Sequence, residues 1–292
     1  MRKLAWVILV SAGMIACNSN NEKSDAYGNF ESTEVIVSAL GQGEILYLHL
    51  EEGDIFQKGA LVGLIDTVDL SLKKNQLILT KEAVRTGLIT IDAQMEVQLQ
   101  QKKNLLVDKD RLEKLYKDGA ATQKQLDDIN GGIDLIDAQL AATKSQKQKI
   151  LAEIQTLDAQ IEQINEALSK CSIVVPSSGT VLTKYAEGGE VAAMGKPLFK
   201  LADMEHMKLK VYVSGDQLPH IKIGQKVEVM IDESKTENRI MEGSIIWVSS
   251  SAEFTPKTIQ TKDERVNLVY AVKVLVKNDG ALKIGMPGEV NF

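Results

Sequence analysis

The 292-residue chain has no excess of positive charge. It contains 34 Lys and Arg residues against 40 Asp and Glu residues, which gives a formal net charge of −6. Nucleic-acid-binding domains usually carry a basic stripe, and proteins held at membranes by charge carry a polybasic patch. The composition therefore argues against a nucleic-acid partner and against electrostatic membrane attachment.

The sequence also lacks the residue patterns of catalytic, metal and nucleotide sites. Its three histidines, His49, His206 and His220, fall on different predicted elements, with no Cys or paired-His spacing of a metal site. The glycines at 41–43 and 188–189 have neither a following helix nor a Lys-Ser/Thr pair, which phosphate-binding loops need. We expect no catalytic residue, no cofactor and no metal, and hence a protein that is not an enzyme.

A long hydrophobic run is missing from the N-terminus. The apolar stretch Leu4–Ala16 follows Arg2 and Lys3 and is too short to cross about 30 Å of hydrocarbon, so we interpret 1–16 as a signal peptide. Its end, Met14-Ile15-Ala16-Cys17, resembles a bacterial lipobox, in which the cysteine is acylated and becomes the new N-terminus. The resemblance implies a lipid on Cys17. The alternative is an ordinary signal peptide with an incidental cysteine.

Cysteines number only two, so no disulfide framework is expected. Acylation of Cys17 would leave Cys171 alone in the mature chain. Cys171 ends a helical pattern and precedes an apolar stretch at 172–175. We therefore expect a small buried hydrophobic residue rather than a reactive thiol.

One segment of the chain occurs twice. Residues 43–66 align without a gap with residues 179–202, and Leu46, Leu48 and Leu50 alternate with polar residues as in a half-buried strand. Glycine supplies positive φ without steric cost, so glycines in register predict shared turns. The identical pairs are Gly43/Gly179, Leu46/Leu182, Glu51/Glu187, Gly53/Gly189 and Gly59/Gly195.

The repeated segment resembles the two halves of a biotinyl/lipoyl domain, a small β-sandwich that carries a modifiable lysine on the hairpin joining its halves. About a hundred residues, Thr67–Lys170, stand where that hairpin would be. The carrier function is therefore predicted to be lost. The two halves are expected to meet in space and to complete one core.

The inserted segment has the period of a coiled coil. Its second half keeps alternating steps of three and four over six heptads, which specifies a coiled-coil seam. The seam positions are Leu126, Ile129, Ile133, Ile136, Leu140, Thr143, Lys147, Ile150, Ile154, Leu157, Ile161, Ile164 and Leu168. The first half is noisier, with Leu77, Val84, Leu88, Ile91, Met95, Leu105, Leu112 and Tyr116 in a compatible register.

Between the two periodic halves the chain is predicted to turn back. Gly119 fits the position after a helix end, and Thr122 with Gln125 fits a capping box. Two arms of about 48 residues would each reach about 70 Å, which suits a rod that spans distance. Gly87 and the pair 131–132 interrupt the arms, and the sequence leaves open whether they give flexibility or close helix approach.

After the second half-repeat the sequence is rich in strands with alternating polarity. We expect a small antiparallel β-barrel with a short helix near Asp216–His220. The predicted fold is α+β: a long antiparallel helical hairpin inserted in a split lipoyl-like β-sandwich, followed by the barrel. The predicted segments are a signal peptide (1–16), a tether (17–33), lipoyl-like halves (34–66 and 171–203), a hairpin (67–170) and a barrel (204–292).

In this order, the segments resemble the HlyD-like membrane fusion, or periplasmic adaptor, family over nearly the full chain. The resemblance implies a periplasmic protein of a Gram-negative bacterium, anchored to the inner membrane by lipid. It also implies a homo-oligomeric ring, a hexamer in our expectation, that connects an inner-membrane transporter to a TolC-like outer-membrane duct. Rival interpretations are a biotin or lipoyl carrier, which the absent lysine turn disfavours, and a purely structural coiled-coil lipoprotein.

At the predicted tip, Arg111, Leu115 and Thr122 resemble the duct-contact pattern of this family, with Thr in place of Ser. The resemblance implies that these residues touch the duct. Each also has a simpler interpretation: a solvated arginine, a leucine that packs the end of the coil, and a threonine that serves as a helix cap.

The segment at 252–274 resembles a barrel loop of adaptors that serve ABC-type exporters, which consist of an ATPase and a permease. Its alternative interpretation is a solvent-exposed loop. The chain also ends directly after the predicted barrel, whereas adaptors of proton-driven pumps usually continue into another domain. Both features favour an ABC-type partner, and an adaptor of a proton-driven RND or MFS pump is the alternative.

Overall fold

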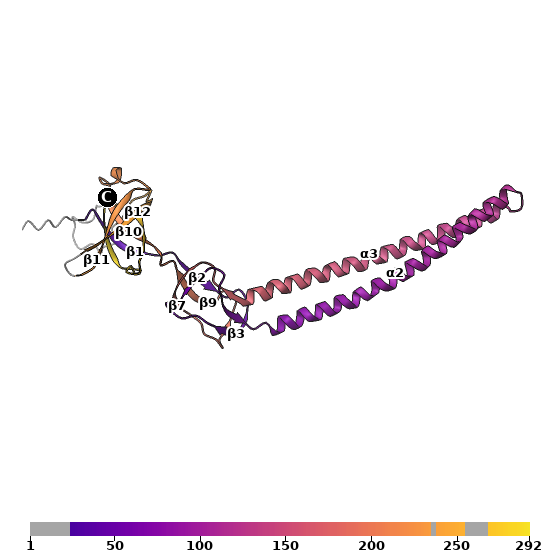
Figure 1. The fold of residues 1–292 in the computed structure, drawn as a ribbon, viewed down its shortest axis with the longest axis horizontal. Coiled ribbons are helices and arrows are strands. Elements are labelled where there is room, and N and C mark those ends of the chain that lie inside the picture. Colours follow the sequence, from indigo (N-terminus) through magenta and orange to yellow (C-terminus); the bar gives the residue numbers. More distant parts are fainter. Residues whose placement is uncertain (1–23, 235–237, 255–267) are drawn as a thin grey trace, which may run out of the picture. The chain divides into compact units, whose positions relative to one another are not determined.

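A computed structural model describes residues 24–234, 238–254 and 268–292, and it has the predicted α+β composition (Figure 1). Two compact units divide the chain. One contains the chain up to Val35, Ser178–Leu182 and Leu201–Phe292, and the other contains Ile36–Ser177 and Thr183–Lys200. Because each unit is assembled from separate stretches, neither can form until distant parts of the chain have met.

The second unit contains the predicted hairpin of two antiparallel helices, α2 (Val68–Lys117) and α3 (Gln123–Cys171) (Figure 1). The helices have 50 and 49 residues, which corresponds to about 75 Å at 1.5 Å per residue. Every predicted seam position of α3 is buried or partly buried, including the polar Thr143 and Lys147. The coiled-coil period predicted for this arm is confirmed.

The seam of α2 continues through polar residues, which explains why its sequence period is noisy. Between the aliphatic seam residues of α2 stand several long polar side chains that are also buried or partly buried. These polar seam residues are Lys74, Lys81, Gln98, Lys102 and Lys109. A lysine can cover a seam with its aliphatic stem while its ammonium group stays near solvent, so a charged residue does not interrupt the coil.

Three lysine–aspartate pairs join the two arms. The Nζ–Oδ1 distances are 2.6 Å for Lys81–Asp158, 2.5 Å for Lys102–Asp137 and 2.6 Å for Lys147–Asp92. Moving toward the tip, α2 and α3 advance by equal numbers of residues from pair to pair, so the register is constant. Partly exposed pairs add little stability. Their geometry instead marks which residues of the two arms lie at the same level.

The glycines of the arms have different surroundings. A Cβ atom on Gly87 would lie 3.4 Å from Ile150 Cδ1, and one on Gly132 would lie 3.7 Å from Leu105 Cδ1. These two glycines therefore lie against the opposite arm. A Cβ on Gly131 would meet nothing within 4 Å. Packing between the arms thus accounts for the position of Gly87 and Gly132 but gives no reason for Gly131.

The two half-repeats interleave. One sheet has the strand order β2-β9-β7-β4 and the other has the order β6-β5-β3-β8, so each sheet takes two strands from each half. The predicted meeting of the halves is therefore confirmed. The strands are β2 (Glu34–Ser38), β3 (Gly43–Leu48), β4 (Ile55–Phe56), β5 (Leu61–Ile65), β6 (Ser172–Val174), β7 (Gly179–Lys184), β8 (Val191–Ala192) and β9 (Pro197–Ala202).

Two of the three aligned glycine pairs have the shared turn conformation that the repeat predicts. Gly53 and Gly189 have φ of 98° and 88°, and Gly59 and Gly195 have φ of 88° and 85°. The pair Gly43/Gly179 differs: only Gly43 has positive φ, whereas a Cβ on Gly179 would lie 2.6 Å from the carbonyl oxygen of Ala202. At 179 the glycine is needed for close backbone approach, which corrects the expectation of a third shared turn.

The equivalent glutamates of the two halves bind one lysine. Lys184 Nζ lies 3.1 Å from Glu51 Oε1 and 2.7 Å from Glu187 Oε2, and its side chain is only 9% exposed. The hydrogen bond from Lys184 to Glu187, and then that to Glu51, raises the lysine pKa against the opposing effect of burial. One cation therefore holds together the same turn of both half-repeats.

The first unit contains a closed barrel, as predicted. Its strands follow the order β10-β1-β15-β11-β12-β14, a pairing of β10 with β14 closes the ring, and β13 extends from β14. Alternating aliphatic residues such as Leu209, Val229 and Val274 are fully buried in its core. The elements are β1 (Ala26–Glu31), β10 (His206–Ser214), η1 (Leu218–His220), β11 (Lys226–Asp232), β12 (Asn238–Val248), β13 (Glu253–Phe254), β14 (Leu268–Lys277) and β15 (Pro287–Asn291).

The strand β1 (Ala26–Glu31) lies within residues 17–33, which we assigned to a tether, and corrects that assignment for the strand residues. It pairs with β10 on one side and with β15 on the other, so it belongs to the barrel wall. Ala26 and Phe30 point into the core and are each 1% exposed. Gly28 stands between them because a Cβ there would lie 1.7 Å from the carbonyl oxygen of Lys210. A six-residue strand whose buried residues are one alanine and one phenylalanine gives too weak a pattern to be recognised from sequence.

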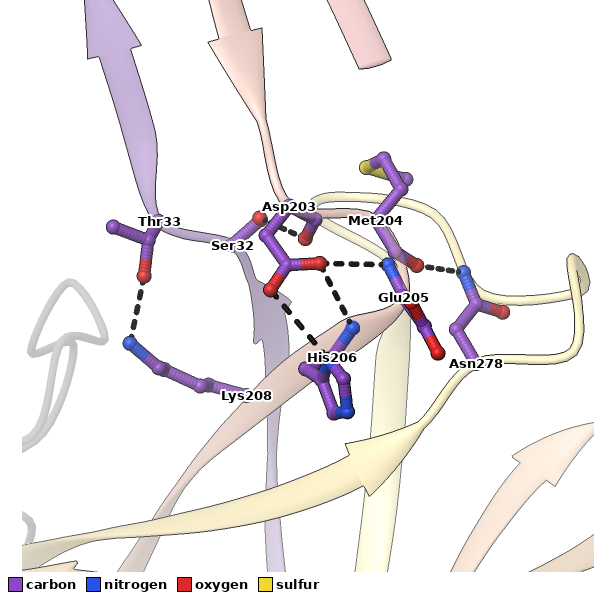
Figure 2. A network of polar contacts seen from close by, with 8 residues as sticks. All are labelled: Ser32, Thr33, Asp203, Met204, Glu205, His206, Lys208 and Asn278. Carbon is purple, nitrogen blue, oxygen red and sulfur yellow. Dashed lines mark hydrogen bonds and ion pairs between the residues drawn. The ribbon is translucent and has the colours of Figure 1, made fainter. Parts of the chain in front are cut away.

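A polar network fixes the segments that follow β1 and precede β10 (Figure 2). Ser32 Oγ donates to the carbonyl oxygen of Asp203, and the Asp203 carboxylate accepts from the backbone N–H of Glu205 at 2.9 Å. Lys208 Nζ donates to Thr33 Oγ1 at 2.7 Å. These contacts tie the chain where it leaves the barrel wall to the chain where it returns.

Candidate functional site at the hairpin tip

The chain reverses between α2 and α3 through a complete glycine-based helix end. Gly119 has φ of 72°, its N–H donates to the carbonyl oxygen of Tyr116 at 3.0 Å, and the N–H of Ala120 donates to that of Leu115 at 2.8 Å. Together these two bonds form a Schellman motif, which satisfies the last carbonyl groups of a helix. The predicted role of Gly119 is confirmed, and the tip is therefore a defined structure.

The start of α3 is held by the predicted capping box. Gln125 N donates to Thr122 Oγ1 at 3.4 Å, while Thr122 N donates to Gln125 Oε1 at 2.7 Å. The Thr122 hydroxyl also donates to Gln125 Oε1 at 3.0 Å. The hydroxyl is thus engaged in the cap in this structure. The capping interpretation of Thr122 is confirmed, and its contact with a duct stays a prediction.

Arg111 and Leu115 lie one helical turn apart on α2, near the tip. The Arg111 side chain is 70% exposed, and Nη1 lies 3.3 Å from Asp108 Oδ1 within the same helix. Leu115 is 41% exposed and does not occupy a seam position. Both side chains are therefore accessible to a partner, and packing of the coil does not account for Leu115.

Tyr116, which we expected to lie in the seam, is 43% exposed instead. It belongs to the last turn of α2, whereas the first seam residue of α3 is Leu126. The opposite arm has no seam residue at the level of Tyr116, so the ring is left open to solvent. The tip therefore presents an aromatic residue that the heptad pattern had assigned to the interior.

Away from the tip, the described part of the chain shows no candidate metal site. Among residues 24–234, 238–254 and 268–292, no group of three or more His, Cys, Asp or Glu side chains is placed to hold a metal ion. Cys171 is 1% exposed with a free thiol, and burial, followed by the nearby charge of Asp66, raises its pKa. The prediction of a buried, unreactive cysteine is consistent with this environment.

The structure does not describe the segment to which the lipid anchor was assigned. Cys17 and the predicted signal peptide lie outside the described residues. Within the part of the chain that the structure describes, none of the helices combines the length and apolarity that a membrane span requires.

Comparison with known proteins gives relatives that match nearly the whole chain, although no family model matches it. A UPF0194 membrane protein of Yersinia enterocolitica is 27% identical over 294 residues, which cover 91% of this chain and 88% of that protein. A UPF0194 membrane protein of Enterobacter sp. strain 638 is 26% identical over 324 residues, which cover 99% and 96%. The similarity therefore includes the hairpin and both β regions.

Solved structures share the fold. MacA from Actinobacillus actinomycetemcomitans aligns with a TM-score of 0.53 at 22% identity, over 91% of this chain and 76% of that chain. A membrane fusion protein from Streptococcus pneumoniae aligns with a TM-score of 0.51 at 14% identity, over 91% and 96%. The fold inferred from the resemblance to that family is confirmed.

Proposed function

We propose that this chain, whose fold is that of the membrane fusion or periplasmic adaptor proteins, is the adaptor subunit of a tripartite export system. It links an inner-membrane exporter to a TolC-like outer-membrane duct and carries out no chemistry itself. The observation that carries the proposal is the hairpin, which replaces the lysine-bearing turn of a lipoyl-type domain with two arms of 50 and 49 residues. A rod of about 75 Å far exceeds what the small β-domain needs for stability.

The proposed duct contact is the face that carries Arg111 and Leu115, together with the capped start of α3 at Thr122. Among the residues that the structure describes, Arg111 is paired with Asp108 of its own helix, and it can exchange that partner for an acceptor on the duct. Arginine is enriched among the residues that dominate protein interfaces, and the exposed leucine beside it adds apolar surface that a partner can bury.

The proposed anchor is a lipid on Cys17. Intact-mass measurement of the protein purified from membranes tests this directly. An acylated N-terminal cysteine supports the anchor, and an unmodified N-terminus at another residue contradicts it.

The proposed inner-membrane partner is an ABC-type exporter. The support is the resemblance of residues 252–274 to the corresponding loop of ABC-type adaptors, of which 255–267 lie outside the described residues. Co-purification of a tagged chain with an ATPase and its permease supports this partner. Recovery of a proton-driven pump in their place favours the alternative.

The duct contact is tested by Arg111→Asp in cells that depend on this chain for export. We expect loss of export, measured as cellular accumulation of a panel of efflux dyes, and loss of cross-linking to the TolC-like protein. Lys114→Asp is the matched control, because Lys114 is 71% exposed on the same helix and is likewise paired within it, with Asp110 at 2.6 Å. Export that survives Arg111→Asp, or is lost equally in both variants, refutes the assigned contact.

A further inference from the structure

The outer faces of the two arms differ in the size of their side chains. On α2, Leu72, Leu79 and Val107 each lie two residues beyond a seam position and so face away from the opposite arm. They are 62%, 70% and 55% exposed. Ile89 and Val97 flank the same face and are 70% and 59% exposed. We call this set the α2 ridge.

Toward the base of the hairpin this heptad position of α3 is Glu166, but from 131 to 159 the same positions carry only small residues. They also lie two residues beyond seam positions, and all are exposed: Gly131, Ala138, Ser145, Ala152 and Ala159. We call this set the α3 row. The one large apolar residue exposed on α3 is Leu135, which lies outside the row. One side of the hairpin, on α2, therefore exposes large apolar side chains, and the opposite side, on α3, exposes small ones.

Large and small residues lie at matching levels. Leu79 is close to Lys81 and Ala159 adjoins Asp158, and those two charged residues pair across the hairpin. Toward the tip, Leu105 lies beside Gly132, which places Val107 near the level of Gly131. At Thr86, Ala93 and Gln100, where α2 has no large apolar residue at this heptad position, the row still carries small residues. Leu79 and Val107 thus have a small residue at their level on the far side of the same hairpin, whereas Leu72 lies near the level of Glu166.

This arrangement fits a second copy of the chain. Copies in a cyclic ring are related by rotation without a shift along the axis, so residues at one level meet. A row of exposed large apolar residues on one helix is a typical sign of an interaction surface. A twofold contact between two α2 faces would place ridge against ridge and leave the α3 row uncovered.

We propose that the α2 ridge of one copy packs onto the α3 row of the next copy, with Leu79 against Ala159 and Val107 against Gly131. The inference deepens the proposed function and rests on it for the ring of copies. It also gives Gly131 a role: its missing side chain, which no contact within the hairpin requires, makes room for Val107 of a neighbour. The contact is heterologous, because two different faces meet, and it closes only when the last copy reaches the first.

The interface is tested by disulfide cross-linking between full-length copies with different tags. One copy carries Leu79→Cys and the other carries Ala159→Cys, and the parent chain with Cys17 and Cys171 sets the background. We expect a strong cross-link between the two tagged copies, and another between Val107→Cys and Gly131→Cys. The matched control is Leu79→Cys with Leu135→Cys, which is 59% exposed on α3 at a different level and should stay at background.

Three results would overturn the proposal: no cross-link above background, equal cross-linking in the control pair, or self-linking of Leu79→Cys alone, which indicates a twofold contact. The cross-link is measured in membranes without any export assay. Cross-linking in cells that fail to export would support the interface and reject the proposed function. Export without cross-linking would support the proposed function and reject the interface.

A size exchange provides the second measurement. Ala159→Leu places a large residue where the proposed interface is filled, so the oligomer measured by light scattering of the solubilised chain should be lost. Because Ala159 is exposed in a single chain, the helical content and melting of the hairpin should not change. Adding Leu79→Ala should restore the oligomer. An oligomer unaffected by Ala159→Leu contradicts the proposed contact.

Discussion

The two arms of the hairpin have nearly equal length and opposite composition. The seam of α3 is almost entirely aliphatic, whereas that of α2 includes four lysines and a glutamine among its buried or partly buried positions. Outside the seam the contrast reverses, because α2 exposes large apolar residues and α3 exposes small ones. The seam of α3 therefore brings more aliphatic residues to the contact between the arms than that of α2, and α2 adds charges that mark the register.

The largest effect should follow from opening a cavity in the seam of α3. Leu157 is 9% exposed, so Leu157→Ala should lower the free energy of unfolding of the hairpin by about 2–4 kcal/mol. Lys81→Ala on α2 removes the ion pair with Asp158 and should cost less than about 1 kcal/mol. Denaturant unfolding followed by the helical signal measures both. Equal losses of unfolding free energy in the two variants would contradict the proposed difference between the seams of α2 and α3.

An intermediate effect is expected at the start of α3. Thr122→Ala removes the acceptor for the Gln125 N–H and should cost about 1 kcal/mol, whereas Thr122→Ser should leave stability nearly unchanged. Thermal unfolding measures the cap, and dye export in the same variants measures docking. If Thr122→Ala keeps its stability but loses export, the hydroxyl acts on a partner and the capping account is insufficient.

The smallest effect has the opposite sign. Gly131→Ala should stabilise a single hairpin by up to about 1 kcal/mol, because alanine has the higher helix propensity and its Cβ meets open space. Gly87→Ala should gain less, since its Cβ would approach Ile150 at 3.4 Å. Melting of the chain at low concentration, where copies are separate, compares the two. A gain that is larger at 87 than at 131 would show that the arms can separate locally.

The elements with a strong period could be predicted from the sequence. The α3 seam, the glycine turn, the capping box and the interleaved half-repeats all follow from local patterns or from self-similarity. The lysines of α2 obscured its period, because the sequence does not show that a lysine stem can fill a seam while its head reaches an aspartate on the other arm. That pairing exists only once the register of the hairpin is known.

Other features could not be predicted because they depend on distant parts of the chain. The two half-repeats carry glycine at the equivalent positions 43 and 179. Only the structure shows that Gly43 needs positive φ, whereas Gly179 needs close approach to the backbone of Ala202. At the tip, the sequence identified Gly119 and Thr122 from local bonding rules. The exposure of Tyr116 follows instead from where the opposite arm begins.

The place of β1 in the barrel affects how the chain folds as it is made. β1 starts at Ala26 and pairs with β15, which ends at Asn291, so the barrel joins segments from opposite ends of the sequence. Contacts of such long sequence separation form slowly, because loop closure must precede them. The hairpin can form earlier, because its arms meet first at the tip, close to the turn, and can then pair progressively toward the base. β1 can pair with β10 once that strand has been made, but its other edge has no partner until β15 follows, so this edge of the unfinished barrel is exposed to aggregation longest.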